Sequence, residues 1–393
     1  MQGPERFSNL PEYAFPRLRG LLDAHEPGGD PIVMTIGEPK HPFPDWVGET
    51  LMGSLDGFGR YPDNNGVPPL RHAIAGWANR RYALNLDADA HVFPLNGTRE
   101  GLFNACLALC PETKRGRQPV VLMPNPFYQV YAVAALAVGA EPVYVPATDA
   151  TGNLPDYAGL PEDVLDRVAV AYICSPANPQ GAVASRAYWQ DLIALAERHD
   201  FQIFADECYS EIYRDTPPPG ALEVAHQMGA DPERVVIFHS LSKRSNLPGL
   251  RSGFVAGGPA SIAQLKQLRS YAGAPLPEPL QAVATRAWND ETHVIASRAR
   301  YQAKYAIADA VLGDVQGYTP PEAGFFLWLP VQDAEVATLK LWQDTGVRVL
   351  PGHYLAREVR GTTPGADRIR VAMVVDEQEL QRGLTKLRDC LYG

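Results

Sequence analysis

The sequence has no apolar run long enough to cross a membrane, since a spanning helix needs ~18–20 consecutive apolar residues. The longest mildly apolar stretch, Val130–Val138, is far shorter. The first residues, MQGPERFSNLPEYAF, also lack the apolar centre of a secretory signal. We therefore expect no membrane partner and a cytoplasmic location.

Cysteine is scarce as well. The chain has five cysteines, an odd number, and none form a C-x-x-C pair. Cys106 and Cys110 are four residues apart, but no second ligand pair completes a zinc site. This usage is typical of reduced, buried thiols. The sequence thus predicts neither a disulfide framework nor a bound metal.

Positive charge is in deficit, with 35 Lys and Arg against 45 Asp and Glu and a formal net charge of −10. Because proteins that bind nucleic acid or anionic membranes are usually basic, we expect neither partner. A local basic pocket for a small anion is compatible with this balance. Hydrophobic residues make up 46% of the chain and charged residues 20%, which is typical of a globular protein. A length of 393 residues predicts two or three domains.

Short apolar runs alternate with amphipathic segments between about residues 60 and 257. The segment 186–199 has apolar residues at helical spacing. The apolar runs lack a clean period of two, which is typical of strands in a sheet covered on both faces. We therefore predict an α/β domain with a mainly parallel central sheet sandwiched by helices. Its predicted strands are Val120–Met123, Val168–Cys174, Phe201–Ala205, Val235–Phe238 and Gly253–Ala256.

The pattern changes after about Tyr271. A long helical region is predicted from Pro279 to Leu312, and shorter strands follow at Phe325–Leu329, Val347–Leu350 and Ile369–Val375. Short elements of both kinds are typical of a smaller α+β layer. We predict a large domain over residues 45–275, and a small domain formed by residues 1–44 together with 276–393.

Reactive side chains follow three successive predicted strands. Asn178 follows the first, Asp206 the second, and a hydroxyl-rich segment with Lys243 the third, with Arg251 eight residues further on. One Asp alone is more often a cap or turn residue, and one Lys a surface residue. Because ligands bind beyond the carboxyl ends of parallel strands, the ordered set predicts one site. It suits pyridoxal phosphate, which needs a lysine for a Schiff base, a carboxylate for the pyridine nitrogen and donors for the phosphate.

At these residues the sequence resembles the class I/II, fold-type I aminotransferases, and the resemblance runs nearly end to end. SLSKRSNLPGLRSGF matches the S-x-S-K…P-G-x-R-x-G signature, SPANPQG the N-P-T-G loop and ADECYSEIY the D-E-x-Y motif. Gln180 stands where Thr is more usual. The resemblance implies a pyridoxal 5′-phosphate cofactor and a ping-pong amino transfer in which Lys243, Asp206 and Tyr209 are catalytic. It further implies that Asn178 and Tyr209 lie at the ring oxygen, Asp206 at the pyridine nitrogen, and Ser240, Ser242 and Arg251 at the phosphate.

Further motifs extend the resemblance to both ends of the chain: IGEP, RYPDNNGVPPLR, LNGTREG, PNPFYQVY and RIRVAM. Taken alone, LNGTREG is an ordinary Asn-Gly turn before a helix, and the tyrosine of PNPFYQVY is an ordinary core residue. The resemblance implies that Tyr61 reaches the phosphate of a neighbouring subunit, so that a homodimer shares its active sites. It also implies phosphate binding by Gly97, Thr98 and Arg99, ring stacking by Tyr128, and substrate binding by Gly37, Asn178 and Arg370, with Arg368 as the alternative arginine.

The resemblance is most specific for the N-succinyldiaminopimelate aminotransferases of lysine biosynthesis. It implies the pair N-succinyl-LL-2,6-diaminopimelate and 2-oxoglutarate/glutamate. Arg99, Arg244 and Lys40 are candidate partners for a distal carboxylate, or else solvated surface charges. Three alternatives stay open: an aspartate, aromatic or broad-range class I aminotransferase; a pyridoxal phosphate-dependent C–S β-lyase; and a non-catalytic regulatory protein of the same fold. The complete lysine, carboxylate and arginine set argues against the last.

Overall fold

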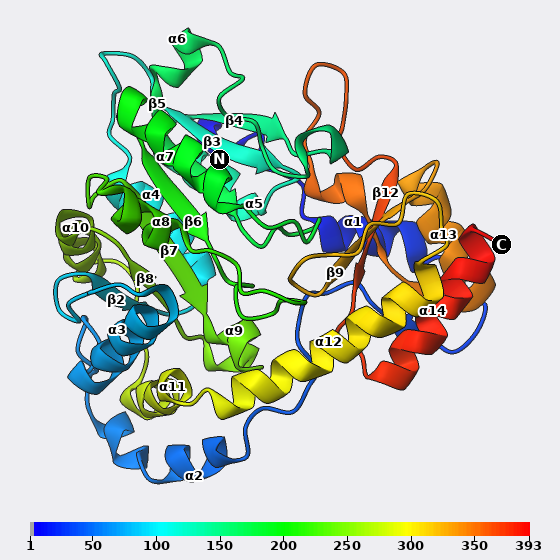
Figure 1. Ribbon diagram of the computed structural model, residues 1–393, viewed down its shortest axis with the longest axis horizontal. Helices are drawn as coiled ribbons and strands as arrows, with labels where there is room; N and C mark the ends of the chain where they lie inside the picture. Colours follow the sequence, from blue (N-terminus) through cyan, green and yellow to red (C-terminus); the bar gives the residue numbers. More distant parts are fainter. Residues whose placement is uncertain (1–3) are drawn as a thin grey trace.

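The computed structural model describes residues 4–393 and has an α/β architecture (Figure 1). The predicted small domain therefore includes three residues, 1–3, that lie outside the described part. The main sheet has seven strands in the order β2-β8-β7-β6-β5-β3-β4. Only β8 runs antiparallel to its neighbours. The strands are β2 (Val92–Leu95), β3 (Val120–Asn125), β4 (Glu141–Pro146), β5 (Val168–Cys174), β6 (Gln202–Asp206), β7 (Val235–Ser240) and β8 (Gly253–Ala256).

Helices cover both faces of this sheet, because successive side chains of a strand point to opposite sides. In β7, Val235 and Ile237 belong to one hydrophobic cluster, and Val236 and Phe238 to another. The first cluster is completed by α3 (Pro68–Tyr82), α7 (Arg186–His199), α8 (Ala221–Met228) and α11 (Glu278–Asn289). The second is completed by α4 (Thr98–Leu109), α5 (Gln129–Ala137) and α10 (Pro259–Arg269). Shorter helices connect these elements: α2 (Trp46–Met52), α6 (Glu162–Leu165) and α9 (Leu241–Arg244).

The second layer holds a three-stranded antiparallel sheet in the order β11-β12-β9, together with a parallel pair, β1 and β10. Its hydrophobic cluster joins these strands to the carboxyl-terminal helices. The strands are β1 (Ile32–Val33), β9 (Phe326–Pro330), β10 (Val347–Arg348), β11 (Leu350–Pro351) and β12 (Arg368–Ala372). The helices of this layer are α1 (Ala14–Leu22), α12 (Thr292–Leu312), α13 (Ala334–Thr345) and α14 (Glu377–Leu391).

Most predicted elements are confirmed; two differ, and strand β4 was missed, each for an identifiable reason. The predicted helix over 279–312 is divided into α11 and α12. The helix is interrupted at Asp290, whose Oδ1 accepts the Thr292 N–H at 2.9 Å at the start of α12. The predicted strand Val347–Leu350 divides into β10 and β11, which pair with different sheets. Strand β4 was not predicted, because its two prolines and half-exposed side chains mark it as an edge strand rather than a buried one.

The packing bears on where the predicted domains meet. Val283 and Ala287 of α11 lie in the same cluster as the main sheet, whereas Tyr301 and Tyr305 of α12 lie in the cluster of the second layer. We therefore propose two domains that meet along α12, rather than at the predicted residue 275. In Figure 1 this helix runs from the main sheet to the second layer.

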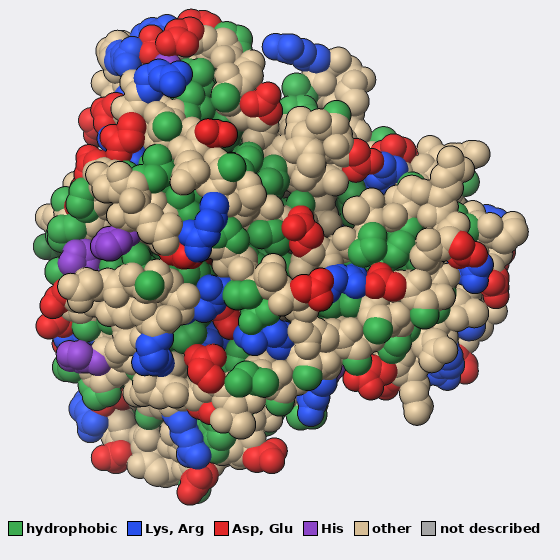
Figure 2. Space-filling view, in the orientation of Figure 1, with side chains coloured by type: hydrophobic (Ala, Val, Ile, Leu, Met, Phe, Trp, Pro, Cys, Tyr) green, Lys and Arg blue, Asp and Glu red, His purple; other side chains and the backbone are tan. Residues whose placement is uncertain are grey.

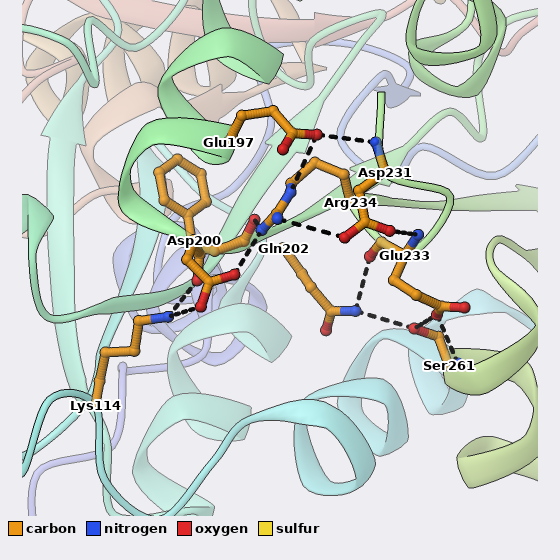
Figure 3. A network of polar contacts seen from close by, with 9 residues as sticks. Lys114, Glu197, Asp200, Gln202, Asp231, Glu233, Arg234 and Ser261 are labelled. Atoms are coloured by element: carbon orange, nitrogen blue, oxygen red, sulfur yellow. Dashed lines mark hydrogen bonds and ion pairs between the residues drawn. The ribbon is translucent and has the colours of Figure 1, made fainter. Parts of the chain in front are cut away.

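The amino ends of β6 and β7 are closed by a polar network (Figure 3). Arg234 is 8% exposed, donates to the Phe201 carbonyl at 2.9 Å and pairs with Asp200 at 3.2 Å. Glu197 and Asp231 lie 3.5 and 3.6 Å from the same guanidinium. The carboxyl ends of the strands, at the opposite edge, carry the predicted site.

None of the helices in residues 4–393 combines the length and the apolarity needed to cross a bilayer.

Candidate active site

A cavity of about 220 Å³ lies at the carboxyl ends of β5 and β6, between the main sheet and the second layer. It brings together most of the residues that the sequence predicted for the site. Among them, those that line it are Gly37, Thr98, Arg99, Tyr128, Asn178, Asp206, Tyr209, Lys243 and Arg370. The predicted residues that do not line it are Tyr61, Gly97, Ser240, Ser242 and Arg251.

Lys243 enters the cavity from α9, the short helix that follows β7. Its ammonium donates a hydrogen bond to the carbonyl of Gly37. Burial lowers the pKa of Lys243 to about 8, and the nearby cations Arg370 and Arg251 act in the same direction. A lysine with this pKa keeps an appreciable fraction of free amine near neutral pH, which a nucleophile or base requires.

Asp206 is the last residue of β6 and is 6% exposed. Its Oδ2 accepts a hydrogen bond from the Tyr131 hydroxyl at 2.7 Å. Burial raises the pKa of this carboxyl, whereas hydrogen bonds from Cys208 and Tyr131 act to lower it. The carboxylate is therefore suited to pair with a cation that enters the cavity.

Tyr131 is the main contributor to the site that the sequence analysis missed. It lies three residues after Tyr128 on the same segment, PNPFYQVY, so the signal was a second tyrosine at helical spacing. Its ring stacks on Tyr172 at 4.4 Å, and its side chain is fully buried. That packing fixes the hydroxyl against Asp206.

Arg370 extends from β12 and is 4% exposed. One of its Nη atoms donates to Asn178 Oδ1 at 3.0 Å and the other to the Thr35 carbonyl at 2.7 Å. Its Nε is buried without a hydrogen-bond partner among residues 4–393, and burial lowers its pKa to about 10. A buried guanidinium with donors to spare and only neutral acceptors is suited to bind a carboxylate. The alternative, Arg368, instead pairs with Asp149 at 2.6 Å and does not line the cavity.

Two tyrosines and one arginine shape the remaining wall. Burial raises the pKa of Tyr209, so its hydroxyl stays protonated and can donate. Arg99 Nε donates to the Tyr128 hydroxyl at 2.8 Å, and the Arg99 side chain is otherwise exposed. The cavity therefore has a cation at its mouth.

The turn before α4 forms a corner next to the cavity that has the features of an anion site. Gly97 has φ +87°, and a Cβ there would collide with the guanidinium of Arg251. No side chain caps α4, so its first N–H groups are available beside Thr98. Ser240, the N-cap of α9, and Thr98 both lie next to Gly253. A Cβ at Gly253 would be 3.5 Å from the Ser240 Cα and 3.4 Å from the Thr98 Cγ2. This combination suits a phosphate.

Two candidate cations for a distal carboxylate lie elsewhere. Arg244 is 3% exposed, pairs with Glu291 at 2.5 Å and lies 4.9 Å from the ring centroid of Trp288. The expectation that it pairs with a distal carboxylate of the substrate is therefore wrong. Lys40 is exposed and does not line the cavity. On the face shown in Figure 2, basic and acidic side chains are interspersed, which leaves the selection of an anion to local groups.

A lysine, a carboxylate and an arginine around one cavity at the carboxyl edge of a parallel sheet define an enzyme that handles amines and carboxylates. Comparison with known proteins is consistent with this. The pattern described as "Aminotransferase class I and II" matches residues 30–387. The chain is 32% identical to an LL-diaminopimelate aminotransferase of Dehalococcoides mccartyi over 399 residues, which covers 98% of each chain.

Solved structures agree with the sequence comparison. An aminotransferase from Neisseria meningitidis superimposes with a TM-score of 0.93 at 36% identity, covering 98% of this chain and 99% of the other. A probable N-succinyldiaminopimelate aminotransferase from Thermus thermophilus gives a TM-score of 0.81 at 26% identity, covering 96% and 100%. The chain belongs to the class I and II aminotransferase family, and it has the fold-type I architecture. It is an aminotransferase, which moves amino groups between amino acids and 2-oxo acids.

Proposed function

We propose that the cavity binds pyridoxal 5′-phosphate and that the chain transfers amino groups between glutamate and a diaminopimelate-type substrate. The observation that carries this proposal is the meeting of Lys243, Asp206, Asn178 and Arg370, from four separate segments, in one cavity. The residues fit the cofactor and an amino-acid substrate in three respects. Asp206 is buried, the backbone at Gly97 lies against the Arg251 guanidinium with no room for a Cβ, and Arg370, on the substrate side, has a buried Nε without a partner within residues 4–393.

The cofactor would be held at both ends by residues of the main sheet. Lys243 would bind its aldehyde carbon and Asp206 its ring nitrogen, while Asn178 and Tyr209 would donate to the ring oxygen and Tyr128 would stack on the ring. The phosphate would lie at the corner formed by the backbone N–H groups of Gly97, Thr98 and Arg99 together with the side chains of Ser240, Ser242 and Arg251. When bound, the cofactor supplies an electron sink for the pair of electrons released at the substrate Cα.

The chain itself supplies proton transfer and orientation. Lys243 Nζ, once the substrate amine has displaced it, would accept the Cα proton, which its lowered pKa permits, and would later return it as a general acid. Arg370 binds the substrate α-carboxylate and so orients the Cα–H bond toward Lys243. Gly37, whose carbonyl accepts from Lys243, keeps the lysine on the substrate side of the cavity.

The second site of a dimer would be completed by Tyr61. Its side chain is fully exposed, which is unusual for a tyrosine in a chain with this many buried aromatics. We propose that Tyr61 reaches the phosphate corner of a second copy and that the enzyme is a cytoplasmic homodimer. Sedimentation should then give the mass of a dimer. Tyr61→Phe should weaken the retention of the cofactor and leave the dimer intact.

The substrate proposal rests on the specific motifs of the sequence and on the names of the relatives. The motifs favour N-succinyl-LL-2,6-diaminopimelate, and the Dehalococcoides relative is named for unsubstituted LL-diaminopimelate. Arg99, at the mouth of the cavity, is placed to pair with a succinyl carboxylate. If it does, Arg99→Ala will raise KM for the succinylated substrate about tenfold and leave KM for glutamate unchanged, since a charged hydrogen bond is worth ~1.5–3 kcal/mol. An unchanged KM for the succinylated substrate would contradict this assignment.

The decisive experiment is a visible absorption spectrum of the protein with added pyridoxal phosphate. We expect a band that requires Lys243, disappears with glutamate and returns with 2-oxoglutarate. Persistence of the band with glutamate would refute the glutamate-linked role. The same titration with N-succinyl-LL-diaminopimelate, LL-diaminopimelate and aspartate ranks the amino donors, and release of pyruvate and ammonia from a cysteine conjugate would indicate a β-lyase instead.

A further inference from the structure

A second buried lysine does not line the cavity, and the reaction described above does not use it. Lys304, on α12, has no exposed surface. Its ammonium donates to the Met373 carbonyl at 3.0 Å and to His41 Nε2 at 3.0 Å. Both acceptors are neutral, and no ion pair among residues 4–393 includes this lysine. Such a charge is costly to bury, and an apolar side chain of the same length would avoid that cost.

The two partners of Lys304 belong to the two segments that present the substrate-facing groups. Met373 directly follows β12, the strand of Arg370. His41 lies four residues after Gly37, whose carbonyl faces Lys243. Lys304 therefore ties the end of one segment to the end of the other.

Within residues 4–393, the other hydrogen bonds between these segments lie near the start of the Gly37 segment. The Ala372 N–H donates to the Met34 carbonyl at 2.8 Å, and Arg370 itself donates to the Thr35 carbonyl. The chain between Thr35 and His41 is thus held at its start by β12 and at its finish by Lys304. Removing the second attachment would leave Gly37 on a segment held by β12 at its start and by the hydrogen bond from Lys243 to the Gly37 carbonyl.

The protonation states agree with this geometry. Burial, together with Lys304 and Arg300, lowers the pKa of His41 to about 4, so its ring is neutral and Nε2 can accept. Burial lowers the pKa of Lys304 to about 8, with Arg300 and Lys40 acting in the same direction and Glu377 and Asp376 against it. The ring of His41 also packs edge-on against Tyr301 at 5.1 Å.

We propose that Lys304 is a positioning residue of this aminotransferase. It holds the Gly37 segment against the strand of Arg370 and so fixes the position of the groups that bind the substrate carboxylate. It contacts neither the cavity nor the reacting atoms. The kinetic part of this inference depends on the proposed function, whereas its structural part does not.

The test compares Lys304→Met with Arg300→Met, in the cofactor-loaded enzyme. Both variants remove one cation from α12, but Arg300 is exposed and its side chain makes no hydrogen bond within residues 4–393. In Lys304→Met we expect KM for glutamate to rise about tenfold, kcat to change less than about threefold, and the cofactor's visible band to be unchanged, because binding rather than chemistry is lost. A KM within about twofold of that of Arg300→Met would overturn the proposal.

Two substitutions at His41 keep the test informative if Lys304→Met does not fold. His41→Phe keeps the ring against Tyr301 and removes the acceptor, whereas His41→Gln restores an acceptor. We expect His41→Phe to reproduce the rise in KM and His41→Gln to reverse most of it. Equal effects of the two would show that packing, and not the hydrogen bond, matters, and would overturn the proposal.

Hydrogen exchange supplies a measurement that does not need catalysis. The amides of Glu38, between Gly37 and His41, and of Met373 are both hydrogen-bonded in the structure. They should exchange faster in Lys304→Met than in Arg300→Met, while amides of β5 stay protected. If wild-type enzyme fails the glutamate titration, the proposed function is wrong, and the exchange comparison still decides the role of Lys304.

Discussion

Removal of the Tyr131 hydroxyl should slow the reaction through its effect on Asp206. The hydroxyl donates to Asp206 at 2.7 Å inside a fully buried stack with Tyr172. A hydrogen bond to a charged group is worth ~1.5–3 kcal/mol. Tyr131→Phe should therefore raise the pKa of Asp206 further, because the carboxylate loses a hydrogen bond that favours its ionised form. A carboxyl that is easier to protonate is a weaker partner for a protonated ring nitrogen.

The assay is the single-turnover reaction with glutamate, followed by the cofactor's absorption. We expect Tyr131→Phe to lower its rate about 10- to 100-fold, as 1.4 kcal/mol corresponds to tenfold. Tyr172→Phe is the matched control, because it removes a buried hydroxyl that donates at the same 2.7 Å, but to the Leu102 carbonyl. Its rate should stay within about threefold of wild type, with a loss of ~0.5–1.5 kcal/mol in the free energy of unfolding. Equal rates in the two variants would refute the assignment of Tyr131 as the partner that keeps Asp206 ionised.

Three other predictions test the cofactor end, the substrate end and the scaffold. The rate of cofactor uptake by the apoprotein should rise with pH and level off above about pH 8. The reason is that burial lowers the pKa of Lys243 to about 8 and only the free amine reacts. A flat profile between pH 6 and 9 would contradict this. Arg370→Met should raise KM for both amino and 2-oxo acids at least about tenfold, since it removes ~1.5–3 kcal/mol of charged hydrogen bonding. Arg368→Met should leave KM unchanged, and the reverse order would reassign the carboxylate to Arg368. Arg234→Met should lower the free energy of unfolding in urea by ~1–3 kcal/mol with KM unchanged, because it leaves the Phe201 carbonyl without its donor. An unchanged unfolding midpoint would show that the network in Figure 3 adds no stability.

The sequence predicted best those parts in which short local segments carry the information. Strand β5 and helix α7 were predicted to the residue, because continuous apolar runs and a clean helical period fix them. The site residues at strand ends, such as Asn178 and Asp206, were found for the same reason. Their assigned roles stay predictions until the cofactor is measured.

Contacts between distant segments were beyond the reach of that reasoning. Arg244 follows Lys243 directly in sequence, yet it turns away from the cavity to pair with Glu291, and only the packing of α11 and α12 explains this. Lys304 lies in an ordinary helical segment, and its importance depends on two partners that are 263 and 69 residues away. Tyr131 differs from both, because it lies within PNPFYQVY, where the resemblance assigned a role to Tyr128 alone.

The placement of β8 bears on which mutations should affect the cofactor contacts and which should affect the substrate contacts. Because β8 runs antiparallel to β7, one short connection carries both Lys243 and Arg251, so the proposed contacts to the two ends of the cofactor form a unit. Arg370 and Gly37 instead belong to segments of the second layer. A shift of that layer would alter the space offered to the substrate and leave the proposed phosphate corner in place, while the Lys243–Gly37 and Arg370–Asn178 hydrogen bonds connect the two layers. We therefore expect mutations in the second layer to change substrate preference more than cofactor retention, and variants in β9 and β12 are where a change of preference should be sought.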